Sequence, residues 1–580
     1  MSKPSDVHSF IPILDWIRSY TTDHFKGDLN AGLTVAIMLI PQGMAYAVLA
    51  GMPPVYGLYA SIVPLIIYAG LGTSRQLAVG PVAMVALLVV AGIGEFAEVG
   101  SDRFIRLAIL TALGVGLVQF LMGVLRMGFL VNFLSHPVLS GFTSAAALII
   151  AASQVRNLLG IDLPQTNYIH EVVTGAFRNI DEINPYTSLI GLGSIGTILW
   201  IRKWKRTFPS ALIVVAAGTL ITAFFQLNSA GVSIIGEIPR GLPAPEWQDF
   251  TWADLRQILP TVLIISLVSY MESYAVAKVI ANKHGYPVNA NQELVALGAA
   301  NIGGFLFQSF PVTGGFSRSA VNDQAGARTG MASIITAGMI ALTVLFLTPL
   351  FYYLPGAVLA AIIMIAVAGL FDVKTMIRLW KTDRKDLAML SVTFIATLTL
   401  GIEEGIAIGV ILSLVIVIYG STRPHSTVLG QLGDTDNFRN IGRYPKAEVT
   451  EEVLIFRFDA PLYFANTEHF LNRINKLAGK KGEKLEVVIL DASAINSIDS
   501  TGIHTVENLI QDLQVRRIGF YIAGAIGPVR DKLKTSGITT LVGEEHFFFD
   551  VSDAVTYHKT KSGNRNLSDT SRFSPIQSNT

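Results

Sequence analysis

Residues 311–330 combine residue types that could bind an anion. The segment reads PVTGGFSRSAVNDQAGARTG and lies between two long apolar stretches. Unpaired backbone groups and charges are costly in hydrocarbon, so this segment cannot be a lipid-facing helix. Its proline and glycine pair favour extended backbone, after which a short helix can begin near Phe316 with Ser317 in its first turn. The free N–H groups of that helix, its dipole and the Arg318 guanidinium together predict an anion site.

Arg318 has a second interpretation, as a loop residue on the cytoplasmic side of a membrane, where basic residues collect. We favour the anion site, because charged residues at membrane depth are usually functional. Arg328, at the far end of the same short helix, is better explained as a loop residue.

A second charged residue, Glu272, lies within the apolar stretch 262–280. It could form a structural ion pair with Arg318, or it could take up a proton, or help to hold a sodium ion, with each anion. We favour this coupling role, since a partly desolvated carboxyl group beside an anion exchanges its proton readily and protonation removes a repulsion.

The elements that hold these residues are predicted to be membrane helices. Of the 580 residues, 51% are hydrophobic and 15% are charged, and the mean hydropathy is +0.51; soluble domains are about a quarter charged. The net charge of +1 gives no indication of nucleic-acid binding. The absence of cysteine excludes thiol catalysis and cysteine metal sites. We find no nucleophile–base set and no metal-ligand spacing, so we expect no enzyme, no metal and no cofactor.

About fourteen apolar segments are predicted, two of them too short to cross a ~30 Å hydrocarbon core as helices. The predicted ranges are 29–50, 55–71, 81–94 (short), 105–125, 131–152, 188–201, 210–227, 259–281, 294–310, 316–325 (short), 331–352, 355–370, 387–400 and 404–419. The basic clusters at 202–206 and 374–385 lie in connections on one side of the predicted membrane, and acidic residues collect in the connections on the other side. We therefore expect a multi-pass protein of the inner (plasma) membrane with both termini in the cytoplasm.

The two halves of this series resemble each other. In each half, the first span carries a polar segment, and one span later an extended stretch leads into a broken short helix. Because each half has an odd number of spans, seven, the second half would cross the membrane in the opposite orientation to the first. Broken spans at corresponding positions of the two halves indicate a transporter binding site. A chance likeness of apolar segments is the alternative.

Composition also divides the chain. We assign 1–27 to a cytoplasmic N-terminal segment and 28–423 to the membrane domain. Residues 445–560 show the alternation of strands and amphipathic helices typical of a soluble α/β domain, and the polar tail 561–580 is expected to be disordered.

Several motifs resemble one family, the SulP anion transporters. They are LIPQGMAYAVLAGMPPVYGLYAS, GTSRQLAVGPVA, GFTSAAA, FSRSAVN and APLYFAN, in that order. The resemblance implies a seven-plus-seven inverted repeat with core and gate domains, followed by a cytoplasmic STAS domain. It also implies an anion substrate between the facing N-termini of the third and tenth spans.

Carried over by motif, those N-termini fall on Val82 and Ala83 and on Phe316, Ser317 and Arg318. The first-span contacts of the family fall on Gln42 and Tyr46, which are one helical turn apart and share a face. A family acidic residue falls on Glu272, where proton-coupled sulfate members carry glutamate and sodium-coupled bicarbonate members carry aspartate. Many members have a serine soon after the proline of the third span, but residues 82–86 contain none, so backbone N–H groups are the better candidates there.

Ser500 follows Asp499 at the start of a helix in the soluble domain. In the anti-sigma-factor antagonists that this domain resembles, the corresponding serine is phosphorylated. The alternative is an ordinary helix N-cap.

We therefore expect a secondary active transporter of a small inorganic anion, most simply sulfate by proton symport, embedded in the lipid bilayer as a homodimer. Bicarbonate or dicarboxylate transport, sodium-coupled or by exchange, is the first alternative. A membrane-anchored STAS signalling protein is a more distant one, because an anchor needs no paired broken helices.

Overall fold

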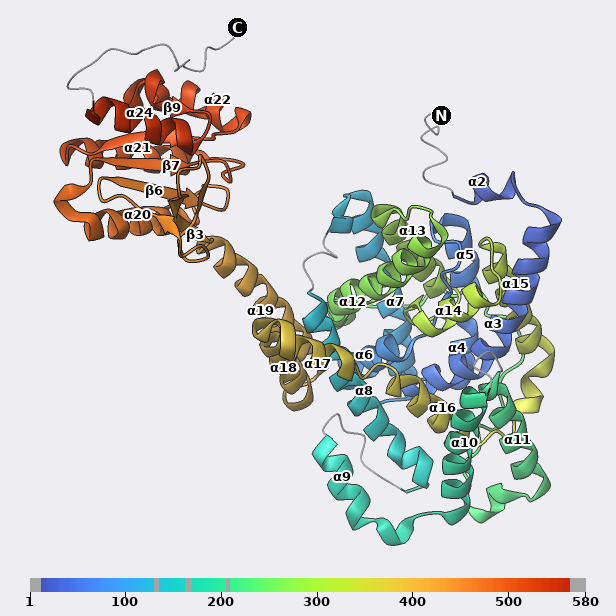
Figure 1. Ribbon diagram of the computed structural model, residues 1–580. Coiled ribbons are helices and arrows are strands. Elements are labelled where there is room, and N and C mark those ends of the chain that lie inside the picture. Colours follow the sequence, from blue (N-terminus) through green and yellow to red (C-terminus); the bar gives the residue numbers. More distant parts are fainter. Residues whose placement is uncertain (1–11, 130–134, 162–168, 205–208, 564–580) are drawn as a thin grey trace. The chain divides into compact units, whose positions relative to one another are not determined.

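The computed structural model describes residues 12–129, 135–161, 169–204 and 209–563 (Figure 1). The chain divides into two compact units, Met1–Ser413 and Leu414–Thr580, and the division falls within a helix. Each unit has its own core.

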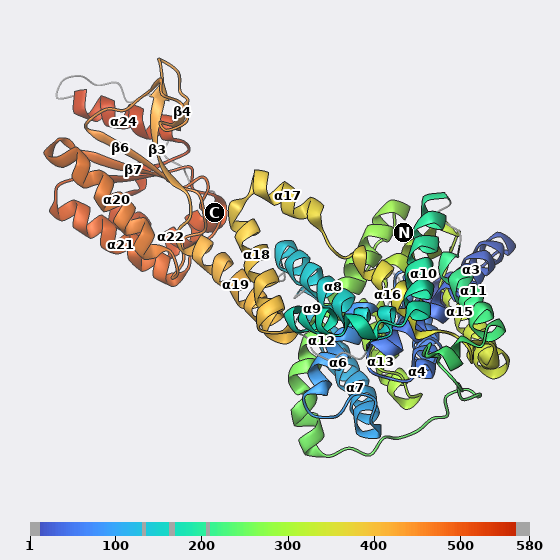
Figure 2. The same ribbon diagram turned by 90° about the horizontal axis from the view of Figure 1, so that it is seen from below.

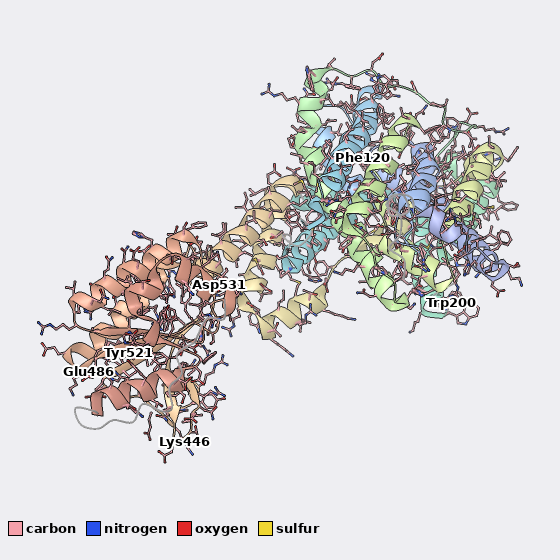
Figure 3. All side chains as sticks on the ribbon, turned by 90° about the horizontal axis from the view of Figure 1, so that it is seen from above. Phe120, Trp200, Lys446, Glu486, Tyr521 and Asp531 are labelled. Carbon is pink, nitrogen blue, oxygen red and sulfur yellow. The ribbon has the colours of Figure 1, made fainter. Side chains whose placement is uncertain are left out.

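Unit 1 is built of apolar helices. Among the described residues, eight helices are long and apolar enough to cross a membrane: Thr22–Leu49, Pro54–Leu71, Asp102–Val124, His136–Leu159, Trp252–His284, Met331–Phe351, Gly356–Thr382 and Glu404–Thr422. Large apolar side chains such as Phe120 and Trp200 lie exposed on this unit (Figure 3), as lipid contact requires. Each of the fourteen predicted ranges contains a helix, while the number that cross the bilayer stays a prediction.

A first group of helices shows the same order of elements twice. The first half contains α3 (Thr22–Leu49), α4 (Pro54–Tyr59), α5 (Val63–Leu71), β1 (Val79–Gly80), α6 (Ala83–Gly94) and α7 (Asp102–Val124). The second half contains α12 (Trp252–His284), α13 (Ala290–Leu306), β2 (Thr313–Gly314), α14 (Phe316–Gln324) and α15 (Met331–Leu342). A long helix with an internal proline opens each half, and a two-residue strand precedes each short helix.

The two halves interlock. Helix α3 packs against α15, and α7 packs against α12 and α13. The α7–α13 contact is close because glycines face each other: a Cβ on Gly298 would lie 2.5 Å from the backbone nitrogen of Phe120 and 2.8 Å from the Gly116 oxygen. Small residues at such contacts let membrane helices approach. The arrangement fixes the two short helices from both sides.

A second group of helices packs largely within itself (Figure 2). It comprises α8 (His136–Leu159), α10 (Pro185–Trp204), α11 (Ser210–Phe224), α16 (Gly356–Ala368) and α18 (Arg384–Thr399). Helix α8 packs against α16 and α18, and α10 packs against α16. Helix α9 (Ile169–Arg178), the π-helical η4 (Thr343–Leu347) and η5 (Thr348–Phe351) complete the irregular connections.

The basic cluster at 374–385, read from sequence as a loop, is partly helical. Helix α17 (Val373–Thr382) begins after Asp372, whose carboxylate accepts from the Thr375 N–H at 3.0 Å. Leu379 is buried while Arg378 is exposed, so α17 has one apolar side and one basic side. An aspartate N-cap is the local cause of this helix.

Unit 2 contains a seven-stranded sheet in the order β4-β3-β6-β7-β8-β9, with β5 on β3. Its strands are β3 (Ser426–Leu432), β4 (Phe438–Asn440), β5 (Ala447–Glu448), β6 (Val453–Phe458), β7 (Val487–Asp491), β8 (Gly519–Ala523) and β9 (Phe547–Phe548). Strands β6 to β9 are parallel. The sheet thus includes β3, upstream of residue 445.

Helices cover both faces of this sheet. One face packs against α20 (Thr467–Lys481), α21 (Ser500–Val515), α22 (Gly527–Thr535) and α23 (Ile538–Val542), and the other against α24 (Val551–Gly563). The five residues of β7 are all buried, which explains the uninterrupted apolar run of that strand. Charged residues such as Glu486 lie at the surface (Figure 3). Unit 2 is a soluble-type α/β domain.

Candidate functional site

The site begins where β1 and β2 meet. The strands pair antiparallel, with Val79 opposite Gly314 and Gly80 opposite Thr313. Helix α6 starts three residues after Gly80, and α14 starts two residues after Gly314. The pairing therefore brings the N-termini of two short helices from different halves next to each other.

Neither N-terminus is capped by a side chain. The N-cap residues are Val82 for α6 and Gly315 for α14, and no side chain makes a capping hydrogen bond at either position. The first N–H groups of a helix have no partner within it. Both helices therefore present free N–H groups and the positive ends of their dipoles, which favour a negative ligand.

The guanidinium of Arg318 lies between these helix starts. The side chain is only 2% exposed, and its Nη1 donates a hydrogen bond to the backbone oxygen of Pro81. It passes close to two glycines: a Cβ on Gly315 would lie 3.0 Å from Nη2, and a Cβ on Gly80 would lie 3.3 Å from it. A larger residue at either position would crowd the guanidinium.

Two donor nitrogens of Arg318 remain without a partner. Nε and Nη2 are buried and make no hydrogen bond to any described residue. A buried charged donor that is left unpaired is expensive. The arrangement is therefore one that an anion would complete, because a tetrahedral or planar oxyanion can accept from both nitrogens.

Glu272 and Tyr46 are electrostatic neighbours of Arg318. Glu272 lies on α12, half-buried, and its Oε2 has no hydrogen-bond partner among the described residues. In this conformation the part of the chain that the structure describes contains no Glu272–Arg318 ion pair, so the structural ion pair considered above is not formed here. The carboxyl group is left free to titrate or to meet a cation.

The remaining predicted residues lie on the helices where we expected them. Gln42 and Tyr46 are buried on α3, 5% and 7% exposed, and α3 packs against α14. Val82 and Ala83 are buried at the start of α6, whereas Phe316 and Ser317 are exposed at the start of α14.

Sequence reasoning missed the polar network that holds β2. Ser273 Oγ lies 2.6 Å from Thr313 Oγ1 and accepts from the Gly314 N–H at 2.7 Å. The Asn301 amide bonds both the N–H and the carbonyl of Val312, at 2.8 and 3.2 Å. These fully buried side chains satisfy extended backbone that a lipid-facing segment could not tolerate.

The network extends to two further helices. Gln119 on α7 accepts from Asn301 at 3.3 Å and donates to Ser269 Oγ on α12 at 2.8 Å. On the other side, Ser319 Oγ accepts from the Ala78 N–H at 2.9 Å and donates to the Gly315 carbonyl at 2.8 Å. A sequence signal existed for Gln119, Ser269 and Asn301, since each is a polar residue within an apolar run, but nothing in the spacing identifies its partner.

In unit 2, Asp499 is the N-cap of α21, and its carboxylate accepts from the Gly502 N–H at 2.7 Å. The N-cap interpretation of this dipeptide is therefore correct for Asp499. Ser500 is exposed at the first position of the helix, where a modifying enzyme could reach it. Among the described residues of both units, no group of three His, Asp or Glu side chains could hold a metal ion.

Two interlocked halves that each contribute a discontinuous helix are characteristic of a multi-pass membrane transporter. In this protein the transporter unit is joined to a soluble-type α/β domain. Comparison with known proteins gives the family. The Sulfate permease family matches residues 25–393, and the STAS domain matches residues 444–554. The chain belongs to the Sulfate permease family and carries a C-terminal STAS domain; it is an anion transporter, and its family is one of transporters, not of enzymes.

Relatives match over nearly the whole chain. Sulfate transporter 4.1, chloroplastic, of Arabidopsis thaliana is 40% identical over 569 residues, covering 95% of this chain and 82% of that protein. A probable sulfate transporter of Mycobacterium tuberculosis (strain CDC 1551 / Oshkosh) is 34% identical, covering 93% and 96%. Among solved structures, the murine Solute Carrier 26 family member A9 anion transporter in the inward-facing state aligns with a TM-score of 0.89 at 26% identity, covering 96% of each chain.

Proposed function

We propose that this protein is a secondary active transporter of sulfate that moves one or more protons with each anion. The observation that carries the proposal is the buried Arg318 guanidinium with two free donor nitrogens, set between two uncapped helix N-termini. The names of the plant and mycobacterial relatives, a sulfate transporter and a probable sulfate transporter, support the choice of anion.

Each residue of the proposed site has a distinct role. Arg318 pairs with the oxyanion, and the N–H groups at Ala83 and Ser317 donate to it from the two helix starts. Gln42 offers an amide donor. Its side chain is buried, with 5% exposure, and makes no hydrogen bond to another described residue. Tyr46, buried one helical turn after Gln42 on α3, borders the proposed anion site.

Glu272 is the proposed coupling residue. A carboxylate near the anion raises the cost of binding through like-charge repulsion, whereas a protonated Glu272 removes that cost. The free Oε2 atom supports this role, since it is available to a proton or a cation. The anion-loaded, deprotonated site is then disfavoured, which ties the anion flux to the proton flux. A sodium ion beside Glu272 would couple in the same way.

The protein is further proposed to reside in the inner (plasma) membrane as a homodimer with both termini in the cytoplasm. The basic clusters at 202–206 and 374–385 support this orientation.

Uptake of radiolabelled sulfate into proteoliposomes tests the proposed function. We expect accumulation when the outside is acidic, collapse of accumulation with a protonophore, and no requirement for sodium. Accumulation that follows a sodium gradient at equal pH would identify sodium, and not the proton, as the coupling ion. No sulfate uptake under any gradient, together with uptake of bicarbonate or a dicarboxylate, would overturn the choice of substrate.

A further inference from the structure

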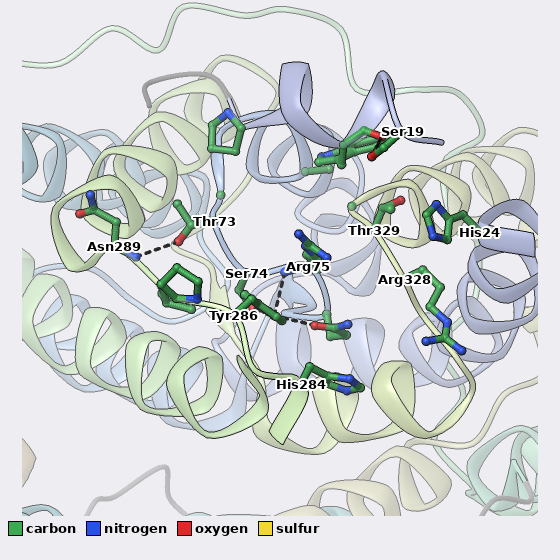
Figure 4. A pocket seen from close by; sticks show the side chains of 18 residues that line it. Ser19, His24, Thr73, Ser74, Arg75, His284, Tyr286, Asn289, Arg328 and Thr329 are labelled. Carbon is green, nitrogen blue, oxygen red and sulfur yellow. Dashed lines mark hydrogen bonds between the residues drawn. The ribbon is translucent and has the colours of Figure 1, made fainter. Parts of the chain in front are cut away.

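A separate cavity of about 780 Å³ lies in unit 1, between the short helix α2 (Ile13–Ile17) and three connecting segments (Figure 4). The segments follow α5, α12 and α14. The volume is typical of sites that hold small organic molecules. Its lining is basic, with two arginines and two histidines, and none of its lining residues in the described structure is Asp or Glu.

Arg75 and Arg328 supply the positive charge. Both side chains are exposed, and neither guanidinium makes a hydrogen bond or ion pair to another residue of the described chain. Arg75 stands in the middle of the opening (Figure 4) and stacks on Tyr286, with its Cζ 5.1 Å from the ring centroid. His284, by contrast, already contacts the Asp323 carboxylate at 2.5 Å. Among the described residues, these two guanidinium groups thus have no carboxylate partner.

Two carboxylates, Asp28 and Glu293, accept hydrogen bonds from the connecting segments that line the cavity. Asp28 accepts from the Arg328 N–H at 2.6 Å and from the Thr329 N–H and hydroxyl at 3.0 and 2.6 Å. Glu293 accepts from the Thr73 N–H and hydroxyl at 2.7 and 2.6 Å. Both shape the connecting segments from within, so neither is needed as a partner of the arginine side chains.

We propose that this cavity binds an organic anion of nucleotide size that carries a phosphate or sulfate group, and that it is a second, regulatory site. Guanidinium groups match the oxygen geometry of phosphate and sulfate and can donate to them in pairs. Trp16 and Tyr286 add aromatic lining on which a flat base or ring can pack.

The walls of the cavity connect to the transport site, and this regulatory step rests on the proposed function. The Tyr286 hydroxyl donates to the side-chain Oε1 of Gln76 at 2.6 Å. The backbone carbonyl of Gln76 accepts from the side-chain amide of Asn322 at 3.0 Å. Asn322 lies on α14, one turn after Arg318, and Gln76 lies just before β1. A ligand that holds Arg75 and Tyr286 therefore acts on α14 and on the segment that leads through β1 into α6, and it slows transport.

Isothermal titration of the full-length protein in phosphatidylcholine nanodiscs tests the site, with ADP as the probe and inorganic phosphate as a second ligand. We expect ADP to bind, and Arg75→Gln and Arg328→Gln each to weaken it ten- to a hundredfold. Arg378→Gln, which removes the same charge from the exposed side of α17, should leave ADP affinity unchanged. Repeating the titration in phosphatidylglycerol nanodiscs separates the sources: competition there assigns the phosphate to a lipid headgroup.

Sulfate binding provides the fold control and separates the two proposals. Arg75→Gln should retain parental sulfate affinity, and Arg318→Ala should retain ADP affinity while it loses sulfate. Absence of ADP and phosphate binding at millimolar concentration, or equal binding by parent and both cavity variants, overturns the second site and leaves the transport site standing. Absence of sulfate binding by the parent protein, with ADP binding intact, overturns only the transport site.

Discussion

Arg318 on α14 donates a hydrogen bond from its Nη1 to the backbone carbonyl of Pro81, the residue that leads into α6. The two residues are 237 positions apart in the chain and belong to different halves of the membrane unit. This contact fixes the guanidinium at the junction of the two discontinuous helices. It also leaves Nε and Nη2 without a hydrogen-bond partner in the described parts of the chain, which is the basis of the proposed anion site.

Glu272→Gln should separate anion binding from anion accumulation. The amide imitates the protonated carboxyl group, so sulfate still binds, but its affinity no longer improves as the pH falls. The variant should exchange labelled for unlabelled sulfate in proteoliposomes yet fail to concentrate it. Uptake at several external pH values, with a parallel sodium series, measures this.

The matched control is Glu404→Gln, which changes an exposed carboxylate on α19 (Ile402–Thr422). It should behave as the parent does. If Glu272→Gln still concentrates sulfate on a proton gradient, Glu272 is not the coupling residue.

Asn301→Ala should destabilise unit 1. The substitution leaves the buried Val312 N–H without its acceptor, and an unsatisfied buried group costs about 1–3 kcal/mol. We expect a lower thermal midpoint in detergent and weaker sulfate binding, because β2 positions α14. Asn228→Ala, at an exposed position, is the control. A parental midpoint for Asn301→Ala would show that the network does not hold β2.

Removal of the chain after Arg423 should preserve sulfate affinity. All proposed site residues belong to unit 1, Met1–Ser413, so the truncated protein keeps every ligand, while its transport rate or assembly changes. Titration of monodisperse truncated protein against the full chain measures this. Loss of affinity would mean that unit 2 contributes to the site.

Ser500 should be phosphorylated in protein isolated from its own cells. The hydroxyl is exposed at the first turn of α21, where the helix dipole stabilises a phosphate. Phosphopeptide mass spectrometry should find the group on Ser500, and Ser500→Ala should abolish it. A phosphate-free peptide from both actively transporting and resting cells would contradict this prediction and leave only the N-cap role of Asp499.

The local parts of this architecture could be predicted from the sequence. Glycine and proline act on the backbone where they stand, so the breaks before α6 and α14 were visible in the residues around Pro81 and Gly315. Apolar runs of sufficient length likewise located the helices. The parallel strand β7 was evident from its uninterrupted apolar residues.

The parts that depend on distant partners could not be predicted. Asn301 meets Gln119 across 182 residues, and a single polar residue in an apolar run does not indicate which helix it faces. The helical form of 373–382 was missed because a basic cluster between spans resembles a loop. The cavity around Arg75 could not be predicted either, because it forms from four segments that only the fold brings together.

Sulfate binding to Arg318→Ala, measured by isothermal titration beside the parent and Arg378→Ala, decides whether the anion site includes Arg318. Loss of charge-assisted hydrogen bonds is worth about 1.5–3 kcal/mol, so we expect about a ten- to a hundredfold weaker affinity for Arg318→Ala. We also expect that this variant still elutes as a folded species and that the control keeps parental affinity. Parental affinity in Arg318→Ala would contradict the anion site between α6 and α14.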